Sequence, residues 1–343
     1  MVKSNIKNLT FEELEGLMLD NGYPKYRARQ IFQWIYKDVE KFKDMKNLPK
    51  DIIEYLNENY YIGRAHAIDK QQSKDGTIKY LLVLEDNNVV ECVLMKYKHG
   101  YSICISSQVG CRMHCSFCAS TEGGLVRNLS AGEMIEEIMA VERESGIKIS
   151  NIVIMGIGEP FDNYNEVIKF LKIVNHKDGI NIGMRHITIS TSGLVPAIYD
   201  FADENLQCNL AVSLHSANDE IRSMLMPINR KYNIEELMKA CDYYIENTNR
   251  RITFEYALID GINDSQEDAK TLSKLLKEKL CHINLIPINP VKGKEYKRSE
   301  LSNINEFIKI IRESGLPVTL RRELGTDIQG ACGQLRKSYL SDN

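Results

Sequence analysis

The sequence has no apolar stretch long enough to cross a bilayer and no apolar leader at its start. Its longest apolar runs, such as residues 152–157, fall far short of the roughly 20 residues that a spanning helix needs. Residues 1–7 lack the apolar core of a signal peptide. We therefore expect a cytosolic, cytoplasmic protein that does not enter a membrane.

The sequence also lacks an excess of charge of one sign. The 343 residues carry a formal net charge of −3, with 44 Lys plus Arg against 47 Asp plus Glu. A chain that attracts a polyanion through its overall field is expected to be strongly basic. Any nucleic-acid site on this protein must therefore be a local patch of positive charge.

Paired cysteine spacings of the kind that build a disulfide framework are absent as well. Cytosolic cysteines stay reduced, and the nine cysteines of this chain are unevenly spread. Cys111, Cys115 and Cys118 lie close together, whereas the others are scattered. This spacing predicts one metal site and leaves each remaining thiol to be explained individually.

Residues 1–75 have the pattern of a small helical accessory domain. Thr10 followed by Glu13 is a capping box at the start of a first helix. Residues 26–36 place apolar side chains at helical spacing, and a third helix is expected to start near Pro49. A packing module and an arm that grips a nucleic acid would both show this pattern, and the sequence alone favours packing.

Residues 76–100 are expected to form a β-hairpin extension, and residues 101–343 an α/β core in which strands and helices alternate. The expected core strands are 102–106, 151–155, 186–190, 209–214, 252–259, 282–286 and 317–320. The expected core helices are 131–143, 164–174, 195–203, 234–246, 266–279 and 304–313. This alternation indicates a parallel sheet covered by helices, so we expect a full or partial (β/α) barrel. Barrels of this kind bind their ligands at the carboxyl ends of the strands.

The three clustered cysteines follow a predicted strand with the spacing C-x3-C-x2-C. Cysteine thiolates at such spacing bind iron–sulfur clusters. Three ligands on a cubane of four irons leave one iron free to bind another molecule. A zinc knuckle or an electron-transfer cluster needs a fourth ligand, for which His114 is poorly placed and Cys104 lies on the preceding strand. We therefore predict a [4Fe-4S] cluster with one open iron.

Several separated motifs resemble those of one enzyme family. They are residues 106–111 (SSQVGC), 155–160 (MGIGEP), 213–216 (SLHS), 226–229 (MPIN) and 331–335 (ACGQL). In this order they are similar to the radical S-adenosylmethionine enzymes and, more narrowly, to the RlmN/Cfr family of RNA adenine methyltransferases, above all its RlmN branch. The resemblance covers nearly the whole chain. It implies a barrel of the radical SAM type, a [4Fe-4S] cluster on Cys111, Cys115 and Cys118, and two S-adenosylmethionine molecules per turnover.

The resemblance also implies the cofactor contacts. Gly158 and Glu159 match the segment that binds the amino group of the methionine moiety, and glycine there permits close backbone approach. The other matched positions lie at predicted carboxyl ends of strands and are Ser190, Ser213, Leu214, His215 and Asn289. Without the resemblance, a strand-ending turn and ordinary helix caps would explain the same residues.

Two catalytic thiols and a base follow from the resemblance as well. The C2 carbon of adenine is electron-poor, so it does not accept a methyl cation from a sulfonium. In the family, the cysteine matched by Cys332 carries a methyl group, from which a 5′-deoxyadenosyl radical takes hydrogen before the carbon adds to the base. Cys104 matches the thiol that releases the product by forming a disulfide bond with Cys332, and Glu91 matches the base that takes the C2 proton. From the residues alone, two other interpretations stay open: an outward-facing side chain for Glu91 and a buried packing role for Cys332.

The implied substrates are an adenine in the peptidyl-transferase region of 23S rRNA and the adenine 3′ of the anticodon in tRNAs. A one-electron donor such as flavodoxin or ferredoxin is implied as a partner, and we expect a monomer. Two alternatives stay open: a Cfr-type enzyme that methylates C8, and a non-catalytic RNA-binding protein with a structural metal. Residues 253–256 and 321–325 are more similar to the C2 branch. The remaining cysteines, interpreted as packing residues, are Cys92, Cys208, Cys241 and Cys281.

Overall fold

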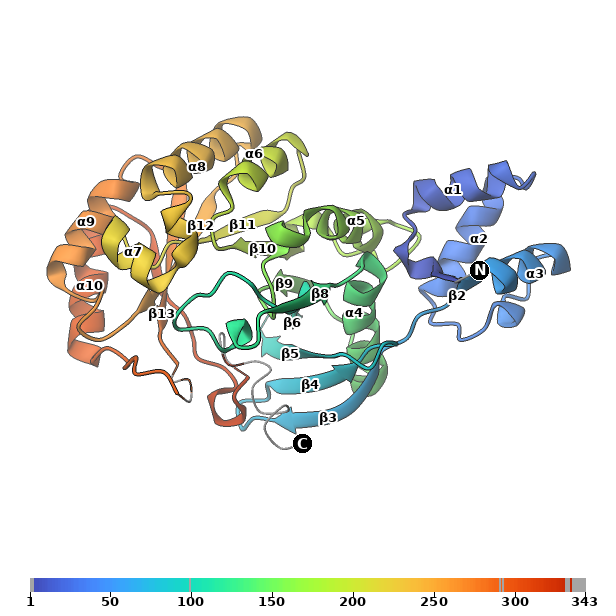
Figure 1. Cartoon of the computed structure of the whole chain (residues 1–343), viewed down its shortest axis with the longest axis horizontal. Coiled ribbons are helices and arrows are strands. Elements are labelled where there is room, and N and C mark those ends of the chain that lie inside the picture. Colours follow the sequence, from blue (N-terminus) through green and yellow to red (C-terminus); the bar gives the residue numbers. More distant parts are fainter. Residues whose placement is uncertain (1–2, 99, 290, 292, 331–333, 335–343) are drawn as a thin grey trace.

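The computed structural model describes residues 3–98, 100–289, 291, 293–330 and 334. Within them, one curved sheet has the strand order β14-β13-β12-β11-β10-β9-β6-β5-β4-β3 (Figure 1). Its parallel strands are β6 (Gly100–Ile105), β9 (Asn151–Ile154), β10 (Ile187–Thr191), β11 (Asn209–Ser213), β12 (Ile252–Leu258), β13 (Cys281–Pro287) and β14 (Val318–Leu320). Three antiparallel strands extend it: β5 (Val89–Tyr97), β4 (Ile78–Val83) and β3 (His66–Gln72).

Helices that connect the parallel strands cover the outer, convex face of the sheet (Figure 1). They are α4 (Ala131–Ser145), α5 (Tyr164–Asn175), α6 (Val195–Asp203), α8 (Ile234–Thr248), α9 (Gln266–Leu276) and α10 (Leu301–Glu313), with the short α7 (Asp219–Leu225) after β11. In the described part of the chain β14 and β3 are the two ends of the sheet order and do not pair with each other. The α/β prediction is confirmed, and the barrel is a partial one.

The extension holds one strand more than the sequence indicated. β4 and β5 form the expected hairpin, and β3 pairs with β4 at the edge of the sheet. Residues 66–72 are mostly exposed and read His-Ala-Ile-Asp-Lys-Gln-Gln, so they lack the apolar alternation that signals a strand. Charged and polar side chains are common on edge strands because they discourage pairing with another chain.

The N-terminal helices pack beside the barrel, next to α4 and α5 (Figure 1). They are α1 (Phe11–Asp20), α2 (Tyr26–Ile35) and α3 (Lys50–Asn59). Lys7 forms a buried ion pair with Glu136 of α4, and the Asn8 side chain accepts a hydrogen bond from the Gly132 N–H at 2.8 Å. A Cβ on Gly132 would lie 2.6 Å from Asn8 Oδ1, so glycine permits this close approach. These contacts fix the helical part against the barrel.

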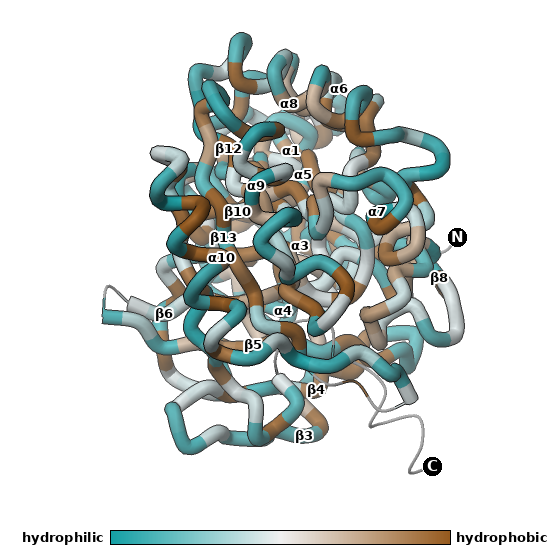
Figure 2. The backbone as a smooth tube through the Cα atoms, turned by 90° about the vertical axis from the view of Figure 1, so that its left-hand side faces the viewer, coloured by the Kyte–Doolittle hydropathy of each residue, from teal (hydrophilic) through white to brown (hydrophobic). Residues whose placement is uncertain are grey.

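The two faces of the extended sheet bury different sets of side chains. Outward residues such as Tyr80, Cys92 and Ile103 join the large core beneath the helices. The inner face carries a smaller apolar group that includes Val93 and Cys104. Figure 2 shows the hydrophobic stretches on the inner segments of the backbone and the hydrophilic ones at peripheral turns. Among the described residues, no helix combines the length and the apolar character that a bilayer crossing requires.

Candidate active site

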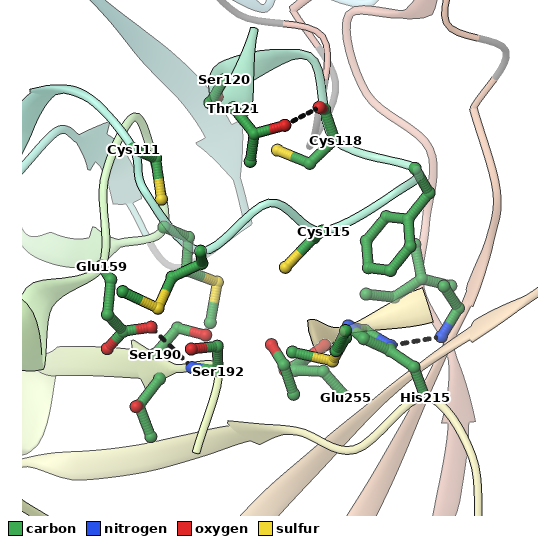
Figure 3. Close-up of a pocket in the computed structure, with 18 of the residues that line it drawn as sticks. Cys111, Cys115, Cys118, Ser120, Thr121, Glu159, Ser190, Ser192, His215 and Glu255 are labelled. Atoms are coloured by element: carbon green, nitrogen blue, oxygen red, sulfur yellow. Dashed lines mark hydrogen bonds between the residues drawn. The ribbon is translucent and has the colours of Figure 1, made fainter. Parts of the chain in front are cut away.

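The carboxyl ends of the parallel strands surround a pocket of about 1030 Å³ that is open to solvent on one side. The loop that carries the three clustered cysteines closes it from above (Figure 3). The site residues predicted from the sequence that line this pocket are Cys111, Cys115, Cys118, Gly158, Glu159, Ser190, Ser213, His215 and Asn289. Leu214 is fully buried and lies behind the pocket wall, where its N–H donates to the Glu255 carbonyl at 3.0 Å.

The cysteine loop lies between β7 (Gln108–Gly110) and β8 (Leu125–Asn128), which pair antiparallel and fix its two ends. Within the loop, the Cys118 N–H donates to the Cys115 carbonyl at 3.1 Å. Figure 3 shows the sulfur atoms of Cys111, Cys115 and Cys118 facing the same space. Burial raises the pKa of the Cys111 thiol to about 12 and raises that of Cys115 as well. Thiols bind metals as thiolates, so a bound iron centre would offset the free-energy cost of ionising these buried thiols.

The three thiols surround a space and do not converge on a point. In the described part of the chain, no three His, Cys, Asp or Glu side chains lie as the ligands of a single metal ion would. The cysteine ligands of a cubane bind different iron corners, so they are spread around the cluster. The arrangement of the cysteines on this pocket wall therefore fits a cluster.

Glu159 is held in place by the backbone around it. Its carboxylate accepts hydrogen bonds from the N–H groups of Phe161 at 3.0 Å and Ser192 at 2.7 Å. Burial raises the pKa of this carboxyl, and the hydrogen bonds from Ser192 partly oppose the shift. An ammonium group of a ligand would stabilise the charged form further.

The glycines before Glu159 allow two loops to touch. A Cβ on Gly156 would lie 2.7 Å from the Ile105 carbonyl oxygen. A Cβ on Gly158 would lie 2.7 Å from the Gln108 Cβ, and Gly158 has a φ of +110° that favours glycine. Close packing against the end of β6 and the start of β7 (Gln108–Gly110) therefore requires these glycines before any ligand is considered.

His215 is a neutral hydrogen-bonding residue of the pocket wall. The Ala257 N–H donates to its Nδ1 at 2.9 Å, so the ring proton is on Nε2. The ring meets Phe117 of the cysteine loop edge to face, with centroids 5.0 Å apart. Burial, assisted by the positive charge of Arg222, lowers the pKa of His215 to about 3. The imidazole therefore stays uncharged at neutral pH.

Comparison with known proteins identifies the family. Residues 105–272 match the radical SAM superfamily, and residues 4–62 match the ribosomal RNA large subunit methyltransferase N-terminal domain. The probable dual-specificity RNA methyltransferase RlmN of Alkaliphilus metalliredigens (strain QYMF) is 53% identical over 343 residues, which are 100% of this chain and 97% of that protein. This chain belongs to the RlmN family of radical SAM RNA methyltransferases.

Further relatives of the RlmN family agree over the whole length. The protein of the same name from Clostridium perfringens (strain SM101 / Type A) is 55% identical over 338 residues, or 98% of this chain and 97% of that protein. The crystal structure of a radical SAM methyltransferase from Sphaerobacter thermophilus matches with a TM-score of 0.90 at 46% identity, covering 97% of this chain and 99% of that one. The enzyme class predicted from the sequence is confirmed.

The radical SAM family implies S-adenosylmethionine and a [4Fe-4S] cluster, and the pocket fits both. Three thiols face one space, as a cluster with one open iron requires. Glu159 offers a buried carboxylate on the same wall, where an ammonium group would find a partner.

Arg222 lies buried behind the wall of this RlmN-family pocket and binds the strand ends that form it. The sequence patterns did not predict this residue. The side chain is fully buried and donates to the carbonyl oxygens of Leu214 at 3.1 Å, Ser192 at 2.8 Å and Ser213 at 3.1 Å. It also donates to Asn229 Oδ1 at 2.7 Å. One guanidinium therefore ties together the ends of β10 and β11. In the sequence, the only pointer to Arg222 among the quoted motifs is its hydrogen-bond partner Asn229, at the end of the 226–229 motif.

Glu255 is a second residue whose place in the site sequence reasoning missed. It lies on β12 and lines the pocket opposite the cysteine loop (Figure 3). Asn284 donates a hydrogen bond to its Oε2 at 2.8 Å. Burial raises the pKa of Glu255, against the opposing effect of Arg321. The sequence did offer one sign of this role, because Glu255 places a carboxylate within the mostly apolar strand sequence of residues 252–258.

A second cavity of about 580 Å³ adjoins the first, and both are lined by Met155, Asn289 and Arg321. Cys104 and Gly330 line the second cavity. Cys332 lies outside the described residues. The disulfide bond between Cys104 and Cys332 therefore stays a prediction.

Proposed function

We propose that this protein methylates C2 of an adenine in 23S rRNA and in tRNAs, with Cys332 as the methyl carrier. The observation that supports this most is that the two cavities adjoin and share lining residues. The first holds the three cysteines, and the second brings Cys104 to Gly330, two residues before Cys332 in the chain. Thiol chemistry at the second cavity can therefore follow cofactor chemistry at the first.

The residues of the first cavity would hold the cofactors. Cys111, Cys115 and Cys118 would bind the cluster, while Glu159 would take the amino group of S-adenosylmethionine. When bound, the cluster and two S-adenosylmethionine molecules per turnover supply the methyl group, the electron and the hydrogen-atom abstraction. Met155 lines both cavities and offers each an apolar wall.

The second cavity would hold the target adenine against the catalytic groups. Cys104 is 6% exposed on β6, and a thiol there can attack the sulfur of Cys332 to release the product as a disulfide forms. Glu91 is buried on the neighbouring strand β5 and would take the C2 proton. Arg321 and Arg322 line the same cavity and provide positive charge for an RNA backbone. In this proposal the protein acts as a monomer in the cytoplasm. Flavodoxin or ferredoxin would supply the electron that the cluster needs.

Mass spectrometry of digested RNA tests the proposal. RNA from cells that express the wild-type protein should contain 2-methyladenosine in 23S rRNA and tRNA, and RNA from cells that express Cys332→Ala should not. An 8-methyladenosine peak would instead identify Cfr-type chemistry. Unmodified RNA together with zinc in the anaerobically purified protein would indicate a structural metal in an RNA-binding protein.

A further inference from the structure

Lys79 of β4 and Glu91 of β5 form a buried ion pair. Lys79 Nζ lies 3.7 Å from Glu91 Oε1, and the side chains are 5% and 2% exposed. Lys79 has no role in the chemistry described above. A lysine is almost never fully buried in a soluble protein unless it is paired.

The strand register places this pair on the catalytic side of the sheet. Lys79 lies directly opposite Val93, and Val93 lies directly opposite Cys104. Residues directly opposite each other point to the same face, as do residues two apart on one strand. Lys79, Glu91 and Cys104 therefore share the inner face of the extended sheet.

Structural stability alone gives a weak reason for this pair. Removing two charges from water costs about as much as their attraction returns, and apolar residues of similar volume often serve equally well. On the inner face nearby, Val93, Met95 and Ile157 pack around Cys104. A charged pair retained in such surroundings, next to a reactive thiol, points to chemistry.

We propose that Lys79 is a positioning residue for proton abstraction, which keeps Glu91 ionised and held on the inner face of the sheet. The inference rests on the proposed role of Glu91 as the base. In that step the C2–H bond breaks, its proton passes to the Glu91 carboxylate and its electron pair stays with the ring. A buried carboxylate without a cation tends to be protonated, and a protonated carboxyl cannot accept the C2 proton.

The decisive measurement is the covalent link between protein and RNA. The base stays bonded to Cys332 through the transferred carbon until the C2 proton has left, so slow deprotonation leaves a protein–RNA adduct. With the reconstituted holoenzyme, Lys79→Met should slow the disappearance of this adduct by about ten-fold or more. Methylation of Cys332 and formation of 5′-deoxyadenosine should continue. Lys79→Arg, which keeps the positive charge, should restore resolution of the adduct.

Lys70→Met provides a matched control, because Lys70 is exposed on the adjacent strand β3. It should behave as the wild type. The double variant Lys79→Met/Glu91→Gln removes both charges of the pair. If Lys79 acts through Glu91, the double variant should accumulate the adduct to the same extent as Glu91→Gln alone. This comparison also covers the case in which Lys79→Met does not fold.

Failure of this inference can be told apart from failure of the proposed function. If Glu91→Gln accumulates adduct and Lys79→Met resolves it at the wild-type rate, Lys79 does not position the base. The same conclusion follows if Lys79→Met loses Cys332 methylation and adduct formation together, or if the double variant is far worse than Glu91→Gln. If Glu91→Gln itself turns over normally, the assignment of the base is wrong, and the role of Lys79 falls with it.

Discussion

The carboxylate of Asp75 accepts a hydrogen bond from the backbone N–H of Gly325 at 2.9 Å, across 250 residues of sequence. The contact joins the turn between β3 and β4 to the segment that leads toward Cys332. In return, the Lys74 N–H donates to Asp327 Oδ2 at 3.3 Å. Gly325 has a φ of +65°, and a Cβ there would lie 3.0 Å from the Thr77 Cγ2. The sheet extension therefore supports the C-terminal segment as well as completing the inner face.

Asp75→Ala should weaken RNA methylation while binding of S-adenosylmethionine continues. The change removes the hydrogen bond from Gly325 and the one from the Thr77 N–H at 2.8 Å within the turn. The turn is exposed, so the contact with Gly325 is worth about 1 kcal/mol and methylation should fall about three- to ten-fold. Affinity for S-adenosylmethionine, which depends on the first cavity, should stay near that of the wild type. Methylated RNA can be measured by mass spectrometry and the affinity by isothermal titration calorimetry.

Asp69→Ala is the control for this prediction, because Asp69 is exposed on β3 and its carboxylate accepts a hydrogen bond from the adjacent Lys70 N–H. It should leave RNA methylation and cofactor affinity unchanged. Equal losses of cofactor affinity and RNA methylation in Asp75→Ala would show that the turn supports the whole fold and not the C-terminal segment.

The sequence predicted those parts of the site that local patterns encode. Alternating apolar strands and helices gave the partial barrel, and the polar residues at strand ends, Ser190 and Ser213 among them, do line the pocket. Arg222 was missed because its four hydrogen bonds are made to groups that only the folded chain brings together. The edge strand β3 was missed because its side chains are polar on both faces.

Cys115→Ala should abolish binding of the iron–sulfur cluster. Cys115 is one of three thiols around the cluster space, and two ligands hold a cubane poorly. Iron and sulfide in the anaerobically reconstituted protein should fall from about four of each to well below one. Cys208→Ala is the matched control, since Cys208 is fully buried beside Met184 away from the pocket. Full iron content in Cys115→Ala would remove this cysteine from the ligand set.

Arg222→Lys should destabilise the protein although it keeps the charge. A lysine ammonium cannot reach the carbonyls of Ser192, Ser213 and Leu214 with the planar geometry of a guanidinium. Breaking a buried charged network costs about 3–5 kcal/mol, which urea unfolding would show as a lower midpoint. Affinity for S-adenosylmethionine should fall too, because the ends of β10 and β11 lose their common tie.

Arg230→Lys makes the same chemical change at an exposed position and should unfold as the wild type does. An Arg222→Lys protein with an unchanged unfolding midpoint would mean that its hydrogen bonds to the strand ends contribute little. If the urea unfolding midpoint of Arg222→Lys fell while its affinity for S-adenosylmethionine stayed unchanged, Arg222 would stabilise the fold without shaping the pocket.

The depressed pKa of His215 should make the protein less stable in acid. In the unfolded chain the imidazole binds a proton below about pH 6.5, whereas in the folded protein it stays neutral until about pH 3. Acid therefore favours the unfolded state, and His215 stabilises the fold fully only above about pH 6.5. Between about pH 6.5 and pH 5 the free energy of unfolding should fall by up to about 2 kcal/mol through this group.

His215→Asn removes the titrating group with little change in shape. Asparagine tolerates the φ of +57° found at this position, and its Oδ1 can accept the hydrogen bond from Ala257 that Nδ1 accepts now. Urea unfolding of the variant should show a flatter dependence on pH across this range. His66→Asn, at an exposed position on β3, should keep the wild-type slope. If the free energy of unfolding of His215→Asn depended on pH as steeply as that of the wild type, the imidazole of His215 would bind its proton in the folded protein as readily as in the unfolded chain. Protonation would then have to occur with the contact between His215 and Phe117 opened.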